Sequence, residues 1–322
     1  MNIGIMATGG IAKKMADTIN LMDEVTLYAV ASRSLEKANA FATEYGAEKA
    51  YGSYDELLSD SKVDLVYIAT PHHTHKDLML ECINKGKNIL CEKAFTINKK
   101  EAEEVFVAAK AKGVLVAEAI WTRYMPSLYL IKSLMTKIGT ITSISANLGY
   151  KISQVERIND PKMGGGALLD LGVYPINFAL MVHPEILSGI SGLCVKAESG
   201  VDIKDSISLR FSDGVMATLF TDATTTTNRR GYIYGTEGFI EVENINCPEE
   251  IRLYDSSRVP QLLETYKITV KTGYEFELLS CKKAIEEGLL ECPEMPHAET
   301  LRVMSLLDAL RHAWNVKLAE EA

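Results

Sequence analysis

The sequence IGIMATGGIA, residues 3–12, decides the fold of this chain. Its apolar start, Ile3–Met6, is typical of a strand that is buried on both faces. A turn containing Gly9 and Gly10 follows and opens an amphipathic segment. Gly9 would let the backbone approach a bound pyrophosphate, and Ala12 would let the helix pack tightly on the strand. The sequence therefore predicts a phosphate-binding turn between its first strand and its first helix.

The same order of elements repeats over residues 2–117, once in roughly 25 residues. Short apolar runs typical of strands cover Ile3–Met6, Val25–Ala31, Leu65–Ala69, Asn88–Leu90 and Val114–Ala117. Amphipathic segments typical of helices lie between them at Ser34–Thr43, Thr74–Lys85 and Asn98–Lys112. Strands that alternate with helices form a parallel sheet covered on both faces. We predict a Rossmann dinucleotide-binding domain over residues 1–120.

After Trp121 the pattern changes, and we predict a second domain over residues 121–322. It begins with a helix, a strand and a glycine-rich helix, at Ser127–Thr136, Thr140–Leu148 and Gly166–Val182. Segments of alternating polarity follow, separated by Asp-Gly and Glu-Gly turn signals, at Ser206–Phe211, Val215–Thr221, Gly231–Tyr234 and Phe239–Val242. Helices at Glu275–Glu287 and Ala298–Trp314 close the chain. The prediction is an α/β protein whose second domain is α+β with an open, mainly antiparallel sheet.

The composition limits the partners of the protein. With 43 acidic and 34 basic side chains, the 322 residues carry a formal net charge of -9, so the chain should repel nucleic acid and anionic lipid. The six cysteines include no Cys-x-x-Cys pair and no Cys/His cluster, which disfavours structural zinc and a disulfide framework. Neither a secretion signal nor a long apolar stretch is visible. We expect a cytoplasmic protein that binds no nucleic acid, membrane or metal.

The first turn supplies five residues that we expect to contact a cofactor. A helix N-terminus offers unpaired N–H groups and about half a positive charge to phosphates. The expected cofactor contacts here are Ala7, Thr8, Gly9, Gly10 and Ile11. Ala7 stands where the usual G-x-G-x-x-G/A pattern has its first glycine, a departure that could change cofactor affinity. The alternative is a tight turn that binds no nucleotide.

The residues after the second strand favour NADP over NAD. NAD-binding proteins usually place Asp or Glu there for the ribose 2'-hydroxyl, whereas this chain has Ser32, Arg33 and Ser34. Arg33 can pair with a 2'-phosphate through two hydrogen bonds, and both serines can donate to it. The alternative is that Arg33 is a solvated residue at a helix start.

Unusual side chains follow two later strands of the predicted parallel sheet. The first segment runs from Thr70-Pro71-His72 to His75, and the second is Glu92-Lys93. Carboxyl ends of parallel strands meet at the edge where open α/β sheets bind ligands, so we expect the Lys93 ammonium at a pocket mouth. The histidines do not predict a metal site, because neighbours in an extended chain point opposite ways and no nearby carboxylate or thiolate completes the ligand set.

A third segment is GGGALLDLGVY at residues 164–174. Its glycines permit close approach of a ligand or of another backbone. Asp170 and Tyr174 are four residues apart and share one face if the stretch is helical. Gly172 and Pro175 predict that this helix is kinked or starts late.

Taken in order, these motifs resemble the glucose-fructose oxidoreductase / inositol dehydrogenase / rhizopine catabolism (Gfo/Idh/MocA) family. The matching segments are the AxGxxA turn, Thr70-Pro71, Glu92-Lys93, EAIWTRY at 118–124 and GGGALLDLGVY at 164–174. Within the family, the chain is most similar to the dimeric dihydrodiol dehydrogenases and the NADP-dependent D-xylose dehydrogenases. One departure besides Ala7 is Ala94, which replaces the proline of the common Glu-Lys-Pro.

The resemblance implies a role for each matching residue. It implies that Lys93 is the catalytic lysine, that Asp170 is the family's acid, and that Tyr174 is a tyrosine where many members carry histidine. It implies further cofactor contacts from Thr70, Pro71, His75 and Glu92, and substrate contacts from His72, Trp121, Arg123 and Tyr124. It also implies that the second domain binds the substrate and that its open sheet is covered by a twin subunit in a homodimer.

The residue types suit hydride transfer. Oxidising a carbinol leaves a proton that needs a base, and an unperturbed tyrosine with a pKa near 10 is almost fully protonated at pH 7. A lysine ammonium about 4 Å away contributes roughly 4 kcal/mol at an effective dielectric of 20, or about three pKa units. We therefore expect Lys93 to bring the pKa of Tyr174 near 7. Proton transfer by Lys93 itself stays open, because the two titrations would be coupled.

The leading hypothesis is an NADP-dependent oxidoreductase, with NAD as second choice, that acts on a sugar, a cyclic polyol or a trans-dihydrodiol. Trp121 and Tyr124 favour a ring substrate with an apolar face, although either could instead be core between the domains. One alternative is a nucleotide-sensing protein without turnover, against which the presence of both Lys93 and a hydroxyl donor argues. Another is an NAD-dependent glycosidase of the same family, against which Arg33 argues.

Overall fold

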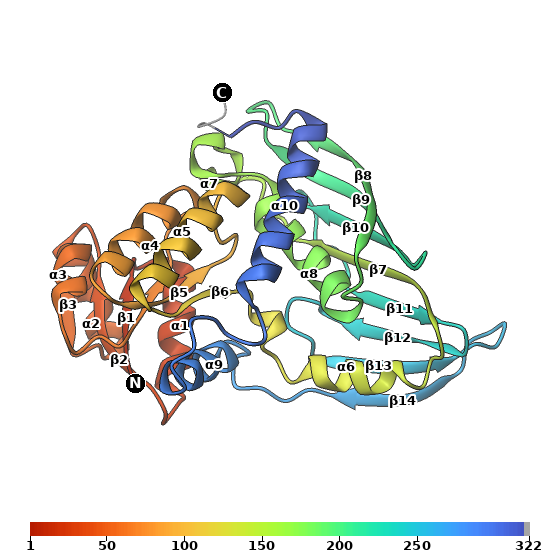
Figure 1. Cartoon of the computed structure of the whole chain (residues 1–322), viewed down its shortest axis with the longest axis horizontal. Helices are drawn as coiled ribbons and strands as arrows, with labels where there is room; N and C mark the ends of the chain where they lie inside the picture. Colours follow the sequence, from red (N-terminus) through yellow and green to blue (C-terminus); the bar gives the residue numbers. More distant parts are fainter. Residues whose placement is uncertain (319–322) are drawn as a thin grey trace. The chain divides into compact units, whose positions relative to one another are not determined.

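Six parallel strands form the first sheet of the computed structural model, which describes residues 1–318 (Figure 1). The strands are β1 (Asn2–Met6), β2 (Thr26–Ala31), β3 (Lys49–Tyr51), β4 (Leu65–Ile68), β5 (Asn88–Glu92) and β6 (Val116–Ala119). They are ordered β3-β2-β1-β4-β5-β6, and every neighbouring pair is parallel. This confirms the predicted Rossmann sheet. The strand order reverses between β1 and β4, which is where such sheets bind ligands.

Helices connect these strands and begin and end at residues with a clear physical reason. They are α1 (Gly10–Asn20), α2 (Leu35–Tyr45), α3 (Tyr54–Ser59), η1 (His72–Thr74), α4 (His75–Asn84) and α5 (Lys99–Lys112). Ser34 and Asn98 cap the N-termini of α2 and α5 by accepting backbone N–H groups. Gly46 and Gly113 end the same helices in the left-handed conformation, which glycine adopts without strain.

Eight strands form the second sheet. They are β7 (Ile141–Gly149), β8 (Leu187–Lys196), β9 (Asp202–Phe211), β10 (Met216–Asp222), β11 (Gly231–Gly235), β12 (Gly238–Glu243), β13 (Glu250–Asp255) and β14 (Leu262–Lys267). The order is β14-β13-β12-β11-β7-β10-β9-β8. All neighbouring pairs are antiparallel except β7 with β10, so the sheet is mainly antiparallel as predicted.

The remaining helices include the one that carries Asp170 and Tyr174. They are η2 (Trp121–Arg123), α6 (Ser127–Met135), α7 (Glu156–Asn159), η3 (Pro161–Met163), η4 (Leu168–Gly172), α8 (Val173–Val182), α9 (Glu275–Glu286) and α10 (His297–Trp314). The helix predicted over Gly166–Val182, expected to be kinked or to start late, consists of a π-helical turn, η4, followed by α8. Pro175 explains the change, because it has no N–H to donate to the carbonyl four residues earlier.

The chain forms two compact units that do not follow the sequence order throughout. Unit 1 comprises Met1–Ile120 and Lys271–Met304, and unit 2 comprises Trp121–Val270 and the residues from Ser305 onward. The first boundary falls at residue 120. The predicted second domain, residues 121–322, differs from unit 2 because residues 271–304 belong to unit 1.

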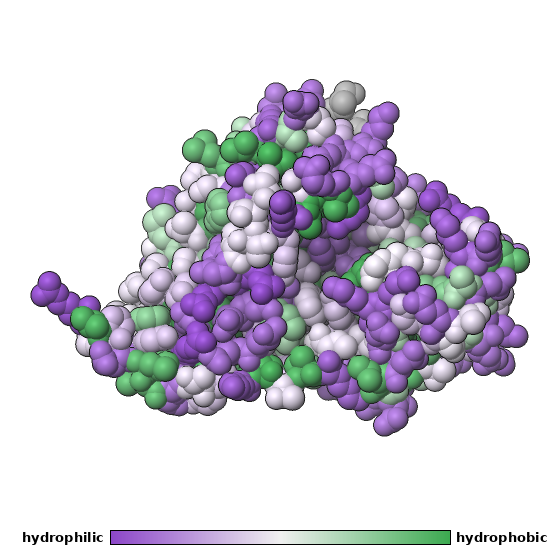
Figure 2. All heavy atoms as spheres, turned by 180° about the vertical axis from the view of Figure 1, so that it is seen from behind, coloured by the Kyte–Doolittle hydropathy of each residue, from purple (hydrophilic) through white to green (hydrophobic). Residues whose placement is uncertain are grey.

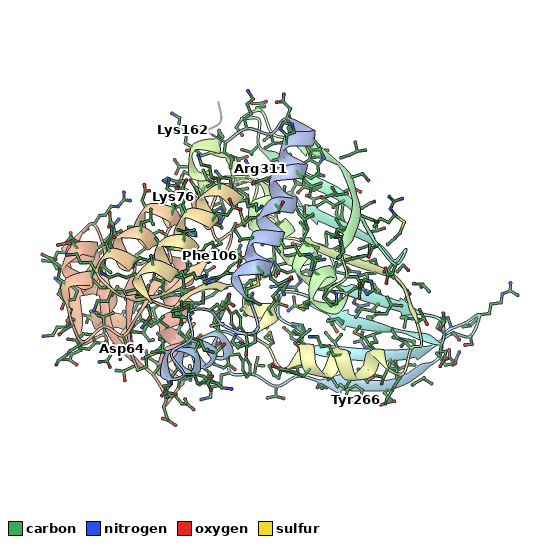
Figure 3. The ribbon with its side chains drawn as sticks, in the orientation of Figure 1. Asp64, Lys76, Phe106, Lys162, Tyr266 and Arg311 are labelled. Atoms are coloured by element: carbon green, nitrogen blue, oxygen red, sulfur yellow. The ribbon has the colours of Figure 1, made fainter. Side chains whose placement is uncertain are left out.

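Specific contacts hold the returning segment to unit 1. The Thr272 and Thr18 hydroxyls are 2.8 Å apart, and the Val116 N–H donates to the Leu290 carbonyl at 3.1 Å. The carboxylate of Glu275, the first residue of α9, accepts backbone N–H groups of residues 271–273 and so fixes the turn that leads into this helix. Figure 3 labels Phe106 on α5, whose ring stacks on His297 of the same segment with centroids 3.8 Å apart.

Residues 161–182, which include η4 and α8, are long enough for a membrane-spanning helix and contain an 18-residue window with a mean hydropathy of 1.4. That 18-residue window is entirely buried inside the protein, as the core helix of a globular domain would be. On the face drawn in Figure 2, hydrophilic side chains cover most of the surface and apolar ones are scattered among them.

Candidate functional site

The phosphate turn of unit 1 is open. An added Cβ at Gly9 or Gly10 would meet no heavy atom within 4 Å, so the space beside this turn could receive a ligand. Helix α1 has no side-chain cap and no acidic residue in its first turn, which leaves its first N–H groups to other acceptors. This environment fits a dinucleotide pyrophosphate.

Ala7 has a left-handed backbone conformation. Its φ is +81°, and its N–H donates to the Ala31 carbonyl at 2.9 Å. A positive φ is the conformation that glycine adopts freely and alanine does not. The turn therefore keeps the backbone shape of the glycine pattern, although the chain has alanine at that position.

The end of β2 places Arg33 at the surface beside two serines. Ser32 is buried, Arg33 is exposed, and the Ser34 side chain accepts the Lys37 N–H at 3.3 Å to cap α2. Burial raises the pKa of Tyr54, and the nearby Arg33 guanidinium acts in the opposite direction. The guanidinium is thus near an aromatic hydroxyl and remains accessible to a ligand.

His75 joins the loops that follow β4 and β5. It is completely buried, and its Nε2 lies 2.8 Å from the Thr70 carbonyl oxygen. Its Nδ1 lies 3.0 Å from the Ala94 oxygen and 3.2 Å from the Phe95 oxygen. Burial lowers the pKa of His75, although the three carbonyls act to raise it. The ring therefore holds the two loops together.

Glu92 fixes the backbone next to Lys93. One of its oxygens accepts the Tyr67 hydroxyl, and the other accepts the Lys93 N–H at 3.3 Å. Lys93 itself is half-buried, and its peptide bond to Ala94 is cis. Two buried anchors, Glu92 and His75, thus hold the short segment that carries the predicted catalytic lysine.

Unit 2 brings Trp121 and Tyr174 together. The Trp121 indole Nε1 donates to the Tyr174 hydroxyl at 3.1 Å, and both side chains are less than a tenth exposed. An indole nitrogen can only donate, so the tyrosine hydroxyl is the acceptor and directs its own proton elsewhere. This orientation was not evident from the sequence, where the two residues are 53 positions apart.

Arg123 and Thr122 anchor the same short helix, η2. The Arg123 Nε donates to the Asn177 side-chain oxygen at 2.6 Å, and Asn177 lies on α8. The Thr122 hydroxyl donates to the Ile245 carbonyl at 2.8 Å. Helix η2 carries the predicted site residues Trp121 and Arg123, and a third, Tyr124, follows it directly. The helix is therefore fixed to α8 and to the loop after β12.

Asp170 pairs with an arginine that sequence reasoning missed. The Arg157 Nη1 lies 2.8 Å from the Asp170 carboxylate, which is buried. Arg157 lies in the short helix α7, whose sequence has no periodic pattern. Its position between β7 and the glycine-rich segment was the only signal for it. Asn177 was missed as well, since a polar residue within an apolar helix was its only signal.

Two buried aspartates support the start of the η4–α8 helix. Asp202 and Asp205 are each 1% exposed, and Asp202 accepts the Leu168 N–H at 2.5 Å. Burial raises the pKa of both carboxyls, and the Asp202 charge raises that of Asp205 further. Arg311 on α10, labelled in Figure 3, favours the ionised form of Asp202. The protonated form is therefore favoured more strongly at Asp205 than at Asp202.

Lys93, His72 and the cofactor residues belong to unit 1, whereas Trp121, Arg123, Tyr124, Asp170 and Tyr174 belong to unit 2. Within residues 1–318, no three His, Cys, Asp or Glu side chains are grouped so that they could hold a metal ion.

Models of one protein family match both parts of the chain. Residues 1–120 match "Oxidoreductase family, NAD-binding Rossmann fold", and residues 134–241 match "GFO/IDH/MocA C-terminal domain". Together they cover more than half of the sequence.

Individual proteins agree over nearly the full length. The trans-1,2-dihydrobenzene-1,2-diol dehydrogenase of Mus musculus is 30% identical over 99% of this chain and 98% of its own. A 3-ketoreductase from Actinomadura kijaniata, solved with NADP and TDP-benzene, has a TM-score of 0.86 at 23% identity, covering 97% of each chain. A levoglucosan dehydrogenase solved with NADH has a TM-score of 0.87 at 20% identity, covering 97% of this chain and 96% of that one.

Proposed function

The chain belongs to the Gfo/Idh/MocA oxidoreductase family, and from this premise we propose that it is an NADP-dependent enzyme acting on a sugar, a cyclic polyol or a trans-dihydrodiol. The reaction class is that of NAD(P)-dependent dehydrogenases and reductases acting on CH–OH groups. The bound nicotinamide supplies or accepts the hydride. The name of the mouse relative supports the dihydrodiol, and those of the structural neighbours support sugars.

The preference for NADP rests on Arg33. Its exposed guanidinium stands between Ser32 and Ser34 at the position of the adenosine ribose, where a 2'-phosphate could accept from it. The pyrophosphate would lie on the turn from Ala7 to Ile11, against the first N–H groups of α1. Thr70 and Pro71, which follow the neighbouring strand β4, are further proposed cofactor contacts, together with His75 and Glu92.

Lys93, Tyr174 and Asp170 are the proposed catalytic residues. The Tyr174 hydroxyl transfers the proton of the substrate oxygen, and Lys93 and Asp170 are the charged groups that assist this step. Glu92 and His75 act through the Lys93 loop, which they fix from either side. His72, Trp121, Arg123 and Tyr124 supply the contacts to the substrate ring.

One observation carries this proposal: the Trp121 indole donates to the Tyr174 hydroxyl at 3.1 Å. A buried indole N–H needs an acceptor, and here it uses the phenol oxygen of Tyr174. Because one lone pair of its oxygen is occupied, the Tyr174 proton must point along another direction, as a proton donor to substrate requires.

The test is an assay of sugars, inositols and dihydrodiols with NADP and with NAD, followed by absorbance of the reduced cofactor. Lys93→Met should lower kcat by at least about 100-fold while nucleotide still binds. An unchanged kcat would refute the role of Lys93. Nucleotide binding without turnover of any substrate would favour a sensing protein, and release of nitrophenol from a nitrophenyl glycoside would favour the glycosidase.

We also propose a cytoplasmic homodimer. One face of the second sheet exposes large apolar side chains, among them Leu193, Met216 and Phe220, of which Leu193 is 79% exposed. A second copy would cover this face and remove it from water. A species of 35.5 kDa in sedimentation at micromolar concentration would contradict the dimer.

A further inference from the structure

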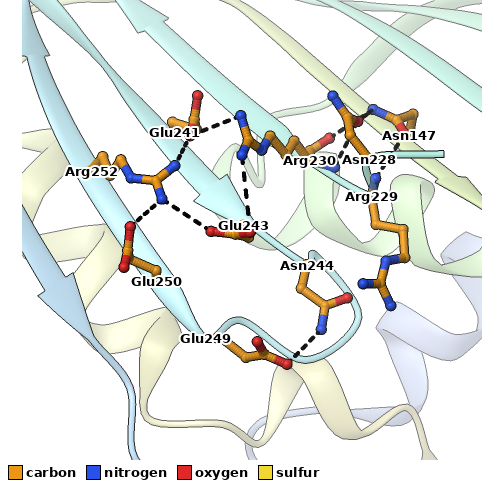
Figure 4. A network of polar contacts seen from close by, with 10 residues as sticks. All are labelled: Asn147, Asn228, Arg229, Arg230, Glu241, Glu243, Asn244, Glu249, Glu250 and Arg252. Carbon is orange, nitrogen blue, oxygen red and sulfur yellow. Dashed lines mark hydrogen bonds and ion pairs between the residues drawn. The ribbon is translucent and has the colours of Figure 1, made fainter.

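Arg229 is a half-buried cation for which no carboxylate of residues 1–318 forms an ion pair. Two other arginines, by contrast, are paired with carboxylates. Arg230 and Arg252 both pair with Glu241 and Glu243, forming a closed charge network. Figure 4 shows the Arg229 guanidinium directed away from that network. Its charge therefore lacks the compensation that adjacent arginines have.

The guanidinium is held in place by an aromatic residue. The Nη1 of Arg229 donates to the Tyr150 hydroxyl at 3.1 Å, and the guanidinium carbon lies 5.4 Å from the Tyr150 ring centroid. The same hydroxyl donates to Asn246 at 3.4 Å. These partners are neutral, so they orient the cation without cancelling its charge.

One edge of the guanidinium remains without a protein acceptor. The Arg229 Nε is buried and has no hydrogen-bond partner in residues 1–318, and no hydrogen bond there involves Nη2. Leaving a buried donor unsatisfied costs about 1 to 3 kcal/mol, which an incoming acceptor would recover. The Nε–Nη2 edge is the one that binds a carboxylate through two parallel hydrogen bonds.

The backbone of Arg229 is fixed next to the proposed substrate residues of unit 2. Its N–H donates to the Asn147 side chain at 3.1 Å, and its carbonyl accepts the Ile245 N–H at 2.9 Å. Ile245 in turn accepts the hydroxyl of Thr122, the residue between Trp121 and Arg123.

A second contact leads to the same place. An added Cβ at Gly231, two residues after Arg229, would lie 2.5 Å from the ring of Phe178. Phe178 is one helical turn beyond Tyr174 on α8. The start of β11 thus packs directly on the helix of the proposed catalytic tyrosine.

We propose that Arg229 binds an anionic oxygen group of the substrate, a carboxylate or a phosphate, remote from the reacting carbon. This inference rests on the proposed function, because it names the substrate class of the same site. In a protein of net charge -9, an anionic substrate needs a local cation to offset general repulsion. Arg229 is a cation with an oriented, unsatisfied edge, and its backbone is bonded to the loop that holds Thr122 of η2.

The experiment uses three probes that share one ring and differ at one carbon: D-glucose, D-glucuronate and D-glucose 6-phosphate. Binding to the NADP-loaded protein is measured by calorimetry, and kcat/KM is measured where turnover occurs. We expect at least one anionic probe to bind more than about 10-fold tighter than glucose. A carboxylate site would favour glucuronate, and a phosphate site would favour glucose 6-phosphate. Anionic probes that bind no better than glucose would overturn the proposal.

Variants locate the preference. Arg229→Met should reduce the ratio of anionic to neutral affinity by about 10- to 100-fold, and Arg229→Lys should retain part of it. Arg210→Met is the matched control because it removes the same charge from an exposed arginine, whose Nε donates to the Ser188 hydroxyl. An equal reduction in Arg210→Met would show only a general charge effect and would also overturn the proposal. Binding decides this independently of turnover, so an inactive enzyme would count against the proposed function and not against Arg229.

Discussion

Ala7 has a backbone conformation that glycine adopts more readily than alanine. Its φ of +81° places it in the left-handed region, where an alanine loses about 1 to 2 kcal/mol relative to its preferred conformation. The hydrogen bond to Ala31 and the entry into α1 fix this geometry from both sides. Positive φ at a non-glycine residue is found where the surrounding structure imposes it, and functional turns are among such places.

Ala7→Gly should therefore raise the free energy of unfolding by about 0.5 to 1 kcal/mol, after allowance for the greater freedom of glycine in the unfolded chain. Urea denaturation followed by circular dichroism measures it. Ala40→Gly, on the exposed side of α2, is the control and should lower the same quantity by about 1 kcal/mol. A loss of stability in both variants would show that the left-handed turn is not strained.

Gly166 illustrates a position where both space and conformation require glycine. Its φ is +114°, and an added Cβ would lie 2.5 Å from an Asp202 oxygen. We expect Gly166→Ala to reduce the free energy of unfolding by about 2 to 4 kcal/mol, because strain adds to displacement of a buried carboxylate. Gly200→Ala has a similar φ of +91° and no neighbour within 4 Å, so it should cost only about 1 to 2 kcal/mol. Equal losses in urea denaturation would contradict the contact with Asp202.

At the scale of elements, the titration of Asp205 on β9 should make the stability of the protein depend on pH. Asp205 on β9 has a raised pKa because it is buried next to Asp202, so the folded state binds a proton that the unfolded state releases above a pKa near 3.9. Stability from this group is therefore present at low pH and is lost as the pH rises from that value through the raised folded pKa.

Asp205→Asn removes the titration and keeps an acceptor for Thr221, whose hydroxyl donates to Asp205 at 2.7 Å in the wild type. The stability of this variant relative to the wild type should increase with pH, by up to about 1.4 kcal/mol per pH unit within that window. Thermal unfolding from pH 5 to pH 8 measures the difference. A difference that is constant or decreases with pH would mean that Asp205 is ionised in the folded protein.

Sequence reasoning succeeded for elements with a strong pattern and failed where the signal is tertiary. The buried apolar runs of β1, β4 and β5 need both faces covered, so they identify a parallel sheet without further information. Strand β3 has only three residues, and β8 is interrupted by glycine and serine, so neither has a readable period. For the π-helical turn, Pro175 predicts that the regular helix is interrupted but not which hydrogen-bond pattern replaces it.

The residues proposed to react could be named from the sequence, but the residues that hold them could not. Lys93 and Tyr174 belong to motifs with fixed spacing, whereas Arg157, Asn177 and Arg229 contact partners that lie far from them in the sequence. A lone arginine in a loop has no distinguishing context until the fold gives it neighbours.

At the scale of the whole molecule, the cysteines are shielded by the fold. Cys82, Cys91, Cys281 and Cys292 are completely buried, and burial raises the pKa of the first two. Cys194 and Cys247 are half-buried, and burial raises the pKa of Cys194 to about 11. We expect at most two of the six thiols to react with a chromogenic disulfide reagent at pH 8 until denaturant is added. Rapid reaction of four or more thiols in the native protein would contradict the complete burial of these four cysteines.

The return of residues 271–304 to the first unit has a consequence for synthesis on the ribosome. When residue 120 emerges, the nucleotide-binding sheet is complete in its strands but lacks α9 and the chain around Leu290 that borders β6. A nascent chain must keep that sheet soluble while some 150 further residues are made, which takes roughly ten to thirty seconds. Interrupted translation within the second unit would therefore release a product in which neither unit is complete.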